Sequence, residues 1–216
     1  MAETRRKPGP RRALTEAEIL EAALALLDTG GAAAVSIRRI AAAVEVAPTA
    51  VYTYFPDKAA VERALIERVL AEVAGAEPGG DWRAQVEALA VDVRGRLIAH
   101  PGAVPLMLDH PLDGPHSLRI GEGLLGQLAA GGLDPASAAR AAYLLKVYVL
   151  GAVALELPPE AERVARRRAA LSEVPAHAFP HTAAAVGVLA TVAGAEQFRW
   201  GLRRVLDGLA AEPELD

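Results

Sequence analysis

The sequence predicts an all-α fold. Apolar residues recur at helical spacing along most of the 216 residues, and the period-2 alternation of amphipathic strands is absent. Hydrophobic residues make up 52% of the chain but aromatic residues only 4%, so the core must be aliphatic and rich in alanine. Such a core favours closely packed helices over sheets.

The first predicted helix begins after Thr15. Thr15 and Glu18 have the spacing of a capping box, and an apolar helical face follows them. Gly30 and Gly31 are expected to end this helix. Ser36 is the expected N-cap of a second helix.

A short third helix is expected after a break at residues 45–47. Pro48 suits its first turn, and Pro56 stops it. Asp57 then caps a longer helix with an expected end near Gly75. Two short helices joined by a three-residue turn have the shape of a helix-turn-helix, whose second helix enters the major groove of DNA.

The rest of the chain is expected to be helical as well. A Glu-Pro-Gly-Gly segment at residues 77–80 marks the predicted domain boundary. We therefore expect a basic flexible arm over residues 1–12, a helix-turn-helix domain over 13–75 and a second helical domain over 76–216. In the second domain, helices are expected over residues 81–100, 101–110, 115–130, 134–156, 160–171, about 183–192 and 195–211, with a loop over 172–182.

Positive charge is concentrated at the N-terminus. The net charge is -4, but residues 1–12 carry five basic side chains, Arg5, Arg6 and Lys7 among them, and one acidic side chain. A basic arm on a mildly acidic body suits contact with nucleic acid, and a disordered solubilising tail is the alternative.

Several classes of site are not expected. The chain has no cysteine, which excludes disulfides, thiolate zinc sites and a cysteine nucleophile and fits a reducing compartment. A GxGxxG match at residues 121–126 follows no strand, and Pro180 separates His177 from His181, so we expect neither a cofactor nor a metal. No catalytic constellation points to an enzyme. No signal peptide or membrane span is expected, which predicts a cytoplasmic protein without a membrane partner.

Residues 36–58 carry the most specific motif. They read SIRRIAAAVEVAPTAVYTYFPDK and resemble the DNA-binding signature of the tetracycline-repressor (TetR) family. In that family the helix-turn-helix ends in an aliphatic-Tyr-x-Tyr/His-Phe run followed by a lysine. The matching residues here are Val51, Tyr52, Tyr54, Phe55 and Lys58.

The resemblance implies contact with a double-stranded DNA operator. Ser36 and Lys58 match phosphate-contacting positions, and Arg38 matches a position near the bases. Core packing is the alternative for the tyrosines. With the arm included, the expected DNA-binding residues are Arg5, Arg6, Lys7, Ser36, Arg38, Arg39, Pro48, Thr49, Ala50, Tyr52, Thr53, Tyr54 and Lys58.

Two residues depart from the family's pattern. Glu45 stands where the family usually has a glycine in the turn, and Ala47 stands at the usual serine cap. A non-glycine residue in a left-handed conformation costs roughly 1 kcal/mol, so the turn is expected to be strained or differently shaped. Ala47 cannot accept a backbone N–H, and Pro48 partly compensates by removing one donor.

Residues 81–156 resemble the TetR-type C-terminal domain through Asp81-Trp82-Arg83, His100-Pro-Gly and the Gly151–Glu156 segment. This implies that the second domain binds a small-molecule inducer. In drug-sensing members a His and a Thr hold a metal-chelated drug. The matching places fall near Leu106 and Asp109, so the metal-binding His is missing and tetracycline is not the expected ligand. The ligand candidates, each of which has a surface or core position as its alternative, are Met107, Asp109, His110, His116, Tyr143, Lys146 and Tyr148.

The resemblance also implies a homodimer held by two late helices of each subunit. A core within one chain is the alternative use of their apolar faces. The expected dimerisation residues are Leu144, Val147, Gly151, Phe198, Leu202, Val205, Leu206 and Leu209.

Together these features predict a homodimeric, ligand-responsive transcriptional repressor that binds a palindromic operator and is released by an inducer. A helical small-molecule-binding protein without specific DNA recognition is the alternative. DNA affinity distinguishes the two.

Overall fold

A computed structural model describes residues 14–75, 79–156, 160–191 and 193–210, and every helix in these ranges supports the predicted all-α fold. The predicted basic arm, with Arg5, Arg6 and Lys7, lies outside the described residues, as do residues 77 and 78 of the predicted boundary. The elements are α1 (Glu16–Gly30), a 3-10 turn η1 (Ala32–Ala34), α2 (Ile37–Ala43), α3 (Pro48–Val51), α4 (Lys58–Leu70), α5 (Trp82–Ala99), α6 (Ala103–Asp109), α7 (Pro115–Ala130), α8 (Pro135–Glu156), α9 (Glu160–Ser172), α10 (Pro180–Leu189) and α11 (Ala195–Ala210).

Side-chain caps define the first helices as the sequence predicts. Thr15 Oγ1 accepts the Glu18 N–H at 3.2 Å, and the Glu18 carboxylate accepts the Thr15 N–H at 2.9 Å. Ser36 and Asp57 cap α2 and α4 with their own side-chain oxygens. These bonds satisfy backbone donors that the first turn of a helix leaves unpaired.

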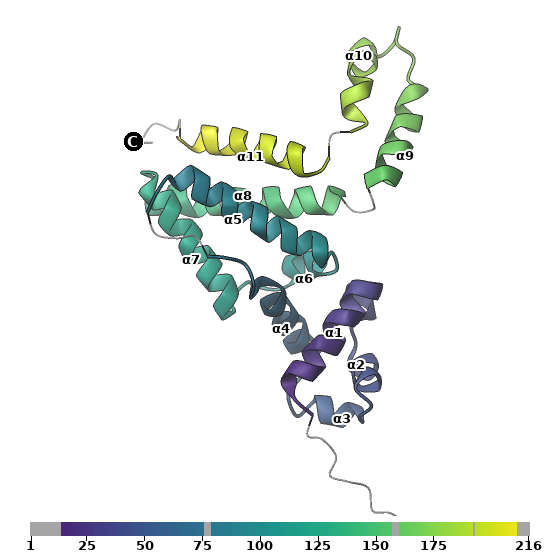
Figure 1. The fold of residues 1–216 in the computed structure, drawn as a ribbon, viewed down its shortest axis with the longest axis vertical. Helices are drawn as coiled ribbons and strands as arrows, with labels where there is room; N and C mark the ends of the chain where they lie inside the picture. The colour runs from purple at the N-terminus through teal and green to yellow at the C-terminus, as the bar shows by residue number, and fades with distance from the viewer. Residues whose placement is uncertain (1–13, 76–78, 157–159, 192, 211–216) are drawn as a thin grey trace, which may run out of the picture.

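The small N-terminal bundle packs around a shared aliphatic core (Figure 1). α4 packs against α1 on one side and against α5, α6 and α7 on the other. It therefore joins the helix-turn-helix to the rest of the chain, together with a contact of His100 with Asp28 of α1. The buried residues of this core include Ile19, Ala23, Leu27, Ile40, Val51, Phe55, Val61 and Leu65.

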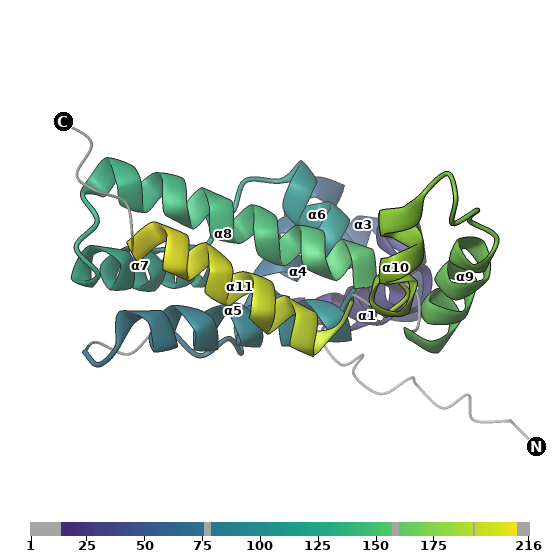
Figure 2. The same cartoon turned by 90° about the horizontal axis from the view of Figure 1, so that it is seen from above.

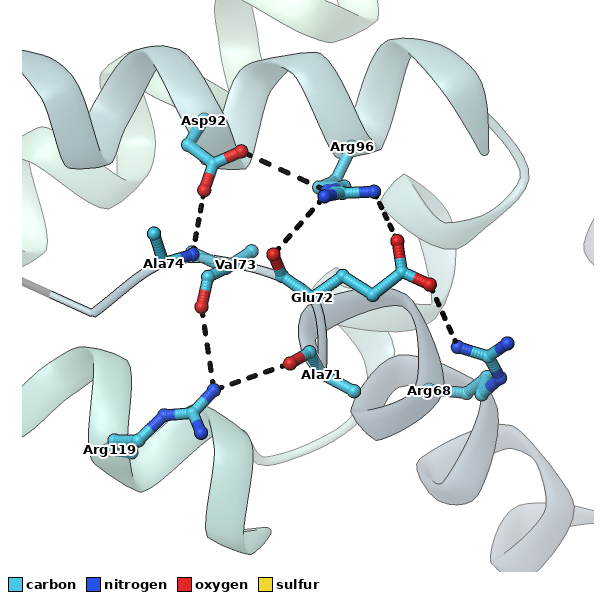
Figure 3. A network of polar contacts seen from close by, with 8 residues as sticks. All are labelled: Arg68, Ala71, Glu72, Val73, Ala74, Asp92, Arg96 and Arg119. Carbon is cyan, nitrogen blue, oxygen red and sulfur yellow. Dashed lines mark hydrogen bonds and ion pairs between the residues drawn. The ribbon is translucent and has the colours of Figure 1, made fainter.

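α4 ends at Leu70, earlier than the expected end near Gly75. Beyond Leu70, backbone groups form hydrogen bonds with side chains of other helices (Figure 3). The Arg119 guanidinium of α7 donates to the Val73 carbonyl at 3.4 Å, and Asp92 of α5 accepts the Ala74 N–H at 2.8 Å. Because these partners are distant in sequence, local pattern could not locate this helix end.

The C-terminal part is a helical bundle. α7 packs against α5 and α8, and α11 packs against the same two helices. Seen from above, α8, α11 and α5 run alongside one another (Figure 2). The predicted helices of this region are confirmed, with bounds that differ by a few residues.

α9 and α10 pack against each other and project beyond the end of α8 (Figure 1). α10 begins at Pro180, so the loop expected over residues 172–182 was too long. Proline suits the first turn of a helix because it has no N–H to leave unpaired. No described residue of α10 is buried.

α8 is 22 residues long, and its most apolar 18-residue window has a mean hydropathy of 1.5. By length and composition alone it could cross a membrane, a property that it shares with core helices of soluble proteins. Its buried positions, such as Leu145 and Val149, face neighbouring helices of the bundle.

Candidate DNA-binding surface and ligand cavity

The turn between α2 and α3 is strained at one residue. Glu45 has φ of 55°, and it is the only non-glycine residue with positive φ in the described ranges. Of the two expected outcomes, a strained turn or a differently shaped one, the structure shows the strained turn. Ala47 makes no side-chain cap, and Pro48 occupies the first turn of α3, also as predicted.

α2 and α3, which carry most of the predicted DNA-contacting residues within the described ranges, lie at the end of the molecule farthest from the C-terminal bundle (Figure 1). Arg38 and Arg39 on α2 are exposed, and the Ser36 hydroxyl already accepts the Arg39 N–H at 3.3 Å. Val51 and Phe55 are buried, as expected of the motif's core. On and after α3, Pro48, Thr49, Tyr52 and Thr53 are exposed and Ala50 is half-buried.

Tyr54 has an internal partner that the sequence did not indicate. Its hydroxyl donates to the backbone carbonyl of Leu14, at the start of α1. A phenol has one proton to donate, so this bond competes with donation to a DNA phosphate. In this structure Tyr54 connects the end of the helix-turn-helix to the residue that precedes the N-cap of α1.

Lys58 lies at the first position of α4, half-exposed, where the DNA-binding motif ends. Its Nζ is 3.0 Å from Oε1 of Glu62, one turn further along the helix. Glu62 is only 9% exposed, and its Oε2 lies 3.2 Å from His110 Nε2. Because a carboxylate only accepts, the ring nitrogen is the donor in that contact.

A cavity of about 470 Å³ lies between α5, α7 and α8. Such a volume is in the range of small-molecule sites. The wall is mostly aliphatic, with Ser117, Glu122, Tyr143 and Lys146 as its main polar or aromatic members. Leu70, the last residue of α4, also belongs to the wall.

Three of the predicted ligand residues line this cavity, namely Met107, Tyr143 and Lys146. The Lys146 ammonium lies 5.2 Å from the centroid of the Tyr143 ring, within range of a cation–π interaction. Both side chains are exposed, so they belong to its solvent-facing rim.

The other four predicted ligand residues do not line this cavity. Asp109 is exposed at the end of α6, and His110 turns to Glu62 instead. His116 lies in the first turn of α7, where its backbone N–H donates to Glu67. Tyr148 of α8 is turned toward α11 and does not belong to the cavity wall.

Tyr148 belongs to the contact between α8 and α11. Its hydroxyl donates to the Phe198 carbonyl at 2.8 Å, and the two rings stack with centroids 5.3 Å apart. Burial raises the pKa of the Tyr148 phenol because the phenolate is poorly solvated there. Tyr148 therefore stabilises the contact between α8 and α11.

Sequence reasoning missed two carboxylates of α4. Glu67 accepts the Ser117 N–H at 3.1 Å and the Ser117 hydroxyl proton, so it caps the N-terminus of α7 from another helix. Glu62 was missed as well. The available signal was the position of Glu62 within the apolar face of α4, between Val61 and Leu65.

Charged side chains also clamp the C-terminal end of α4 (Figure 3). Glu72 accepts hydrogen bonds from Arg68 at 3.4 Å and from Arg96 of α5. The hydrogen bond from Arg68 and the charge of Arg96 lower the pKa of the Glu72 carboxyl. α4 is thus held by polar contacts at both ends.

The predicted dimerisation residues fall into two sets. On α8, Leu144 and Val147 are 45% and 49% exposed, and Gly151 is exposed beside them. On α11, three of the predicted residues are buried in the chain's own core, the arrangement that the intramolecular alternative describes. Phe198, Leu202 and Leu206 are buried, and Val205 and Leu209 are half-buried against the same core.

Among the described residues, no group of three or more His, Asp or Glu side chains is arranged to hold a metal ion.

Two family descriptions match the chain. Residues 19–65 match "Bacterial regulatory proteins, tetR family", and residues 74–212 match "Tetracyclin repressor-like, C-terminal domain". An HTH-type transcriptional regulator of Saccharopolyspora erythraea is 32% identical over 161 residues, which is 74% of this chain and 68% of the relative. The HTH-type transcriptional repressor DrrR1 of Streptomyces coeruleorubidus is 28% identical over 96% of this chain and 82% of its own length.

Solved structures agree. The Streptomyces coelicolor TetR family protein ActR in complex with (S)-DNPA aligns with a TM-score of 0.84 and 26% identity, covering 93% of this chain and 98% of ActR. A possible TetR family regulator from Streptomyces coelicolor A3(2) aligns with a TM-score of 0.77 and 33% identity, covering 90% and 98%. The chain, with its helix-turn-helix and its cavity-bearing helical bundle, therefore belongs to the TetR family of transcriptional regulators.

Proposed function

We propose that this regulator represses transcription as a homodimer that binds a palindromic operator and releases it when a small molecule enters the cavity between α5, α7 and α8. One observation carries the proposal. α4 supplies Lys58 to the DNA-binding end and Leu70 to the cavity wall. The 13 residues of α4 are separated by 12 helical steps, which span about 18 Å, so a single helix connects the two places.

The DNA contacts follow from exposure and chemistry. Arg38 is the candidate for a bidentate contact with guanine, because α3 carries no Arg, Asn or Gln. Thr49, Thr53 and Tyr52 supply hydroxyls, and Pro48 and Ala50 supply apolar contacts to thymine methyl groups. Ser36 and Lys58 position the motif on phosphates, with the basic arm and Arg39 adding charge.

The ligand is proposed to be a small molecule with a largely apolar body. The aliphatic wall buries such a body, and the rim formed by Tyr143 and Lys146 meets its polar end. The solved structures of ActR with (S)-DNPA and with actinorhodin support a small-molecule ligand for this fold.

The dimer is proposed to form through the exposed side of α8. Leu144, Val147 and Gly151 lie on one helical stripe, and Leu155 extends it with 66% exposure. Two copies joined by a two-fold axis would present two α3 helices to the half-sites of a palindrome. The proposed division of labour places DNA binding in residues 13–75 and ligand binding and dimerisation in 76–216, in a cytoplasmic protein.

The proposal is tested by incubating the purified protein with fragmented genomic DNA from its source and sequencing what it retains. An enriched inverted repeat is the expected result, and its neighbouring genes would indicate the ligand. Retention of no DNA, or of DNA without a shared sequence, would favour a ligand-binding protein without operator recognition.

A further inference from the structure

The connection between α6 and α7, residues 110–114, contacts α4 through His110 and the cavity through Leu112. At its start, His110 contacts Glu62. Just after it, the first turn of α7 is capped by Glu67. Two carboxylates of α4 thus hold this connection and the helix that follows it.

Glu62 differs from Glu67 in contacting a lysine of its own helix as well as a side chain of the connection. Its Oε1 is 3.0 Å from Lys58 Nζ, and its Oε2 is 3.2 Å from His110 Nε2. The residue is 9% exposed, so water cannot readily replace a missing partner of its carboxylate. A buried carboxylate that loses all its partners is strongly destabilised.

His110 is also tied to the cavity along the chain. Met107, three residues before it, and Leu112, two residues after it, both line the cavity wall. A molecule that moved these two side chains would therefore move His110 relative to Glu62.

We propose that Glu62 is a positioning residue for DNA binding, and that its hydrogen bond with His110 sets how readily Lys58 leaves Glu62 for a DNA phosphate. The inference rests on the proposed phosphate contact of Lys58. While His110 donates to Glu62, the carboxylate keeps one of its two described partners when Lys58 moves to DNA. When His110 is withdrawn, Glu62 retains Lys58, and the ammonium does not reach the phosphate.

This arrangement predicts that a ligand in the cavity weakens DNA binding, which is the response expected to an inducer. A ligand that displaces Met107 and Leu112 would draw His110 away from Glu62. Lys58 would then be held by Glu62, and affinity for every DNA sequence would fall. The coupling passes through one shared carboxylate and does not require α3 to change shape.

The test measures binding of the full-length protein to a duplex of random sequence of about 30 base pairs, between about 50 and 200 mM salt. Lys58→Met should reduce the slope of log K against log salt by about 0.9 for each phosphate that the protein no longer neutralises. His110→Ala should reduce the slope similarly and weaken binding roughly tenfold at low salt, as expected when a hydrogen bond to a charged group is removed. His110→Gln should keep most of the affinity, because its amide can donate to Glu62.

Double variants show whether His110 acts through Lys58. His110→Ala should add nothing in the Lys58→Met background, and nothing in the Glu62→Gln background, where the neutral amide no longer retains Lys58. Glu67→Gln is the matched control, because Glu67 holds the neighbouring turn of α7 but does not contact Lys58; it should leave the salt slope unchanged. Thermal unfolding of each variant verifies the fold. If His110→Ala does not fold, His110→Phe, which keeps a ring but has no donor for Glu62, replaces it with the same expected loss of slope and affinity.

Different failures have different meanings. If the unmodified protein binds neither this duplex at any salt concentration nor fragments of genomic DNA, the proposed function is wrong, and the inference falls with it. If the protein binds DNA, but His110→Ala leaves the slope unchanged or weakens binding equally with and without Lys58, only the role of Glu62 is wrong. An unchanged salt slope in Lys58→Met would also overturn the proposed role of Glu62.

Discussion

Glu45→Gly should make the protein more stable. Glu45 is exposed and holds φ of 55° in the turn between α2 and α3. A side chain in this left-handed conformation costs about 1–2 kcal/mol, which glycine avoids because it has no Cβ. Glycine loses more chain entropy on folding, which offsets about 0.4–1 kcal/mol of that gain. The expected net increase in the free energy of unfolding is about 1 kcal/mol.

Urea denaturation followed by circular dichroism measures this change. With a slope of about 2 kcal/mol per molar urea, the midpoint should rise by about 0.5 M. All samples need the same protein concentration, because association makes apparent stability depend on concentration.

Glu45→Ala is the control that isolates the backbone effect. Alanine removes the charge and most of the side chain but keeps the Cβ, so the strain should remain. The reasoning is refuted if alanine stabilises the protein as much as glycine, since the gain would then come from the side chain. A lower midpoint for Glu45→Gly would refute it as well.

Further predictions concern the DNA surface, the dimer and acid stability. Arg38→Ala should relax preference at one base pair per half-site, whereas Lys58→Ala should weaken binding to all sequences alike; binding to a panel of single-base operator variants separates the two, and equal loss in both without altered preference would contradict this division. Leu144→Glu should shift sedimentation toward a monomer, because it places a charge in the proposed interface. Val188→Glu, a control at another exposed aliphatic residue on α10, should not. Equal behaviour of the two variants would argue against the α8 interface. The pKa of Glu72 is lowered below its ordinary value of 4.5, so its contribution to stability is complete above that value and is lost as the pH falls through the folded-state pKa. Glu72→Gln should therefore lower the urea midpoint at pH 7, and the gap to the unmodified protein should shrink as the pH falls below 4.5 and through the lowered folded-state pKa. A gap independent of pH would contradict the charge-based account.

Local chemistry explains why the N-terminal part was predictable. Thr15, Ser36 and Asp57 cap helices through atoms a few residues away, and the sequence alone contains that information. The strained Glu45 turn is also a local property, set by which residue occupies one backbone conformation.

Long-range packing explains what the sequence did not reveal. Tyr148 and Lys146 are close in sequence and lie on the same apolar helix, yet one faces α11 and the other faces the cavity. Phe198 and Leu202 form a stripe that fits an interface or a core equally well, and only the arrangement of α5 and α8 makes it a core. Glu62 and Glu67 resembled surface charges because their partners are about 50 residues away.

The central claim, that the cavity controls the DNA-binding surface, can be tested before the ligand is known. Gly121 lies on α7 in the cavity wall, and a Cβ added there meets no atom within 4 Å, so Gly121→Trp can place an indole in the cavity. Gly126 on the same helix is exposed, is not part of the wall and has equally open space, which makes Gly126→Trp the matched control. Thermal unfolding first verifies that both variants are folded. Gly121→Trp should then bind the enriched operator much more weakly than Gly126→Trp. Equal operator affinity of the two variants would contradict the claim.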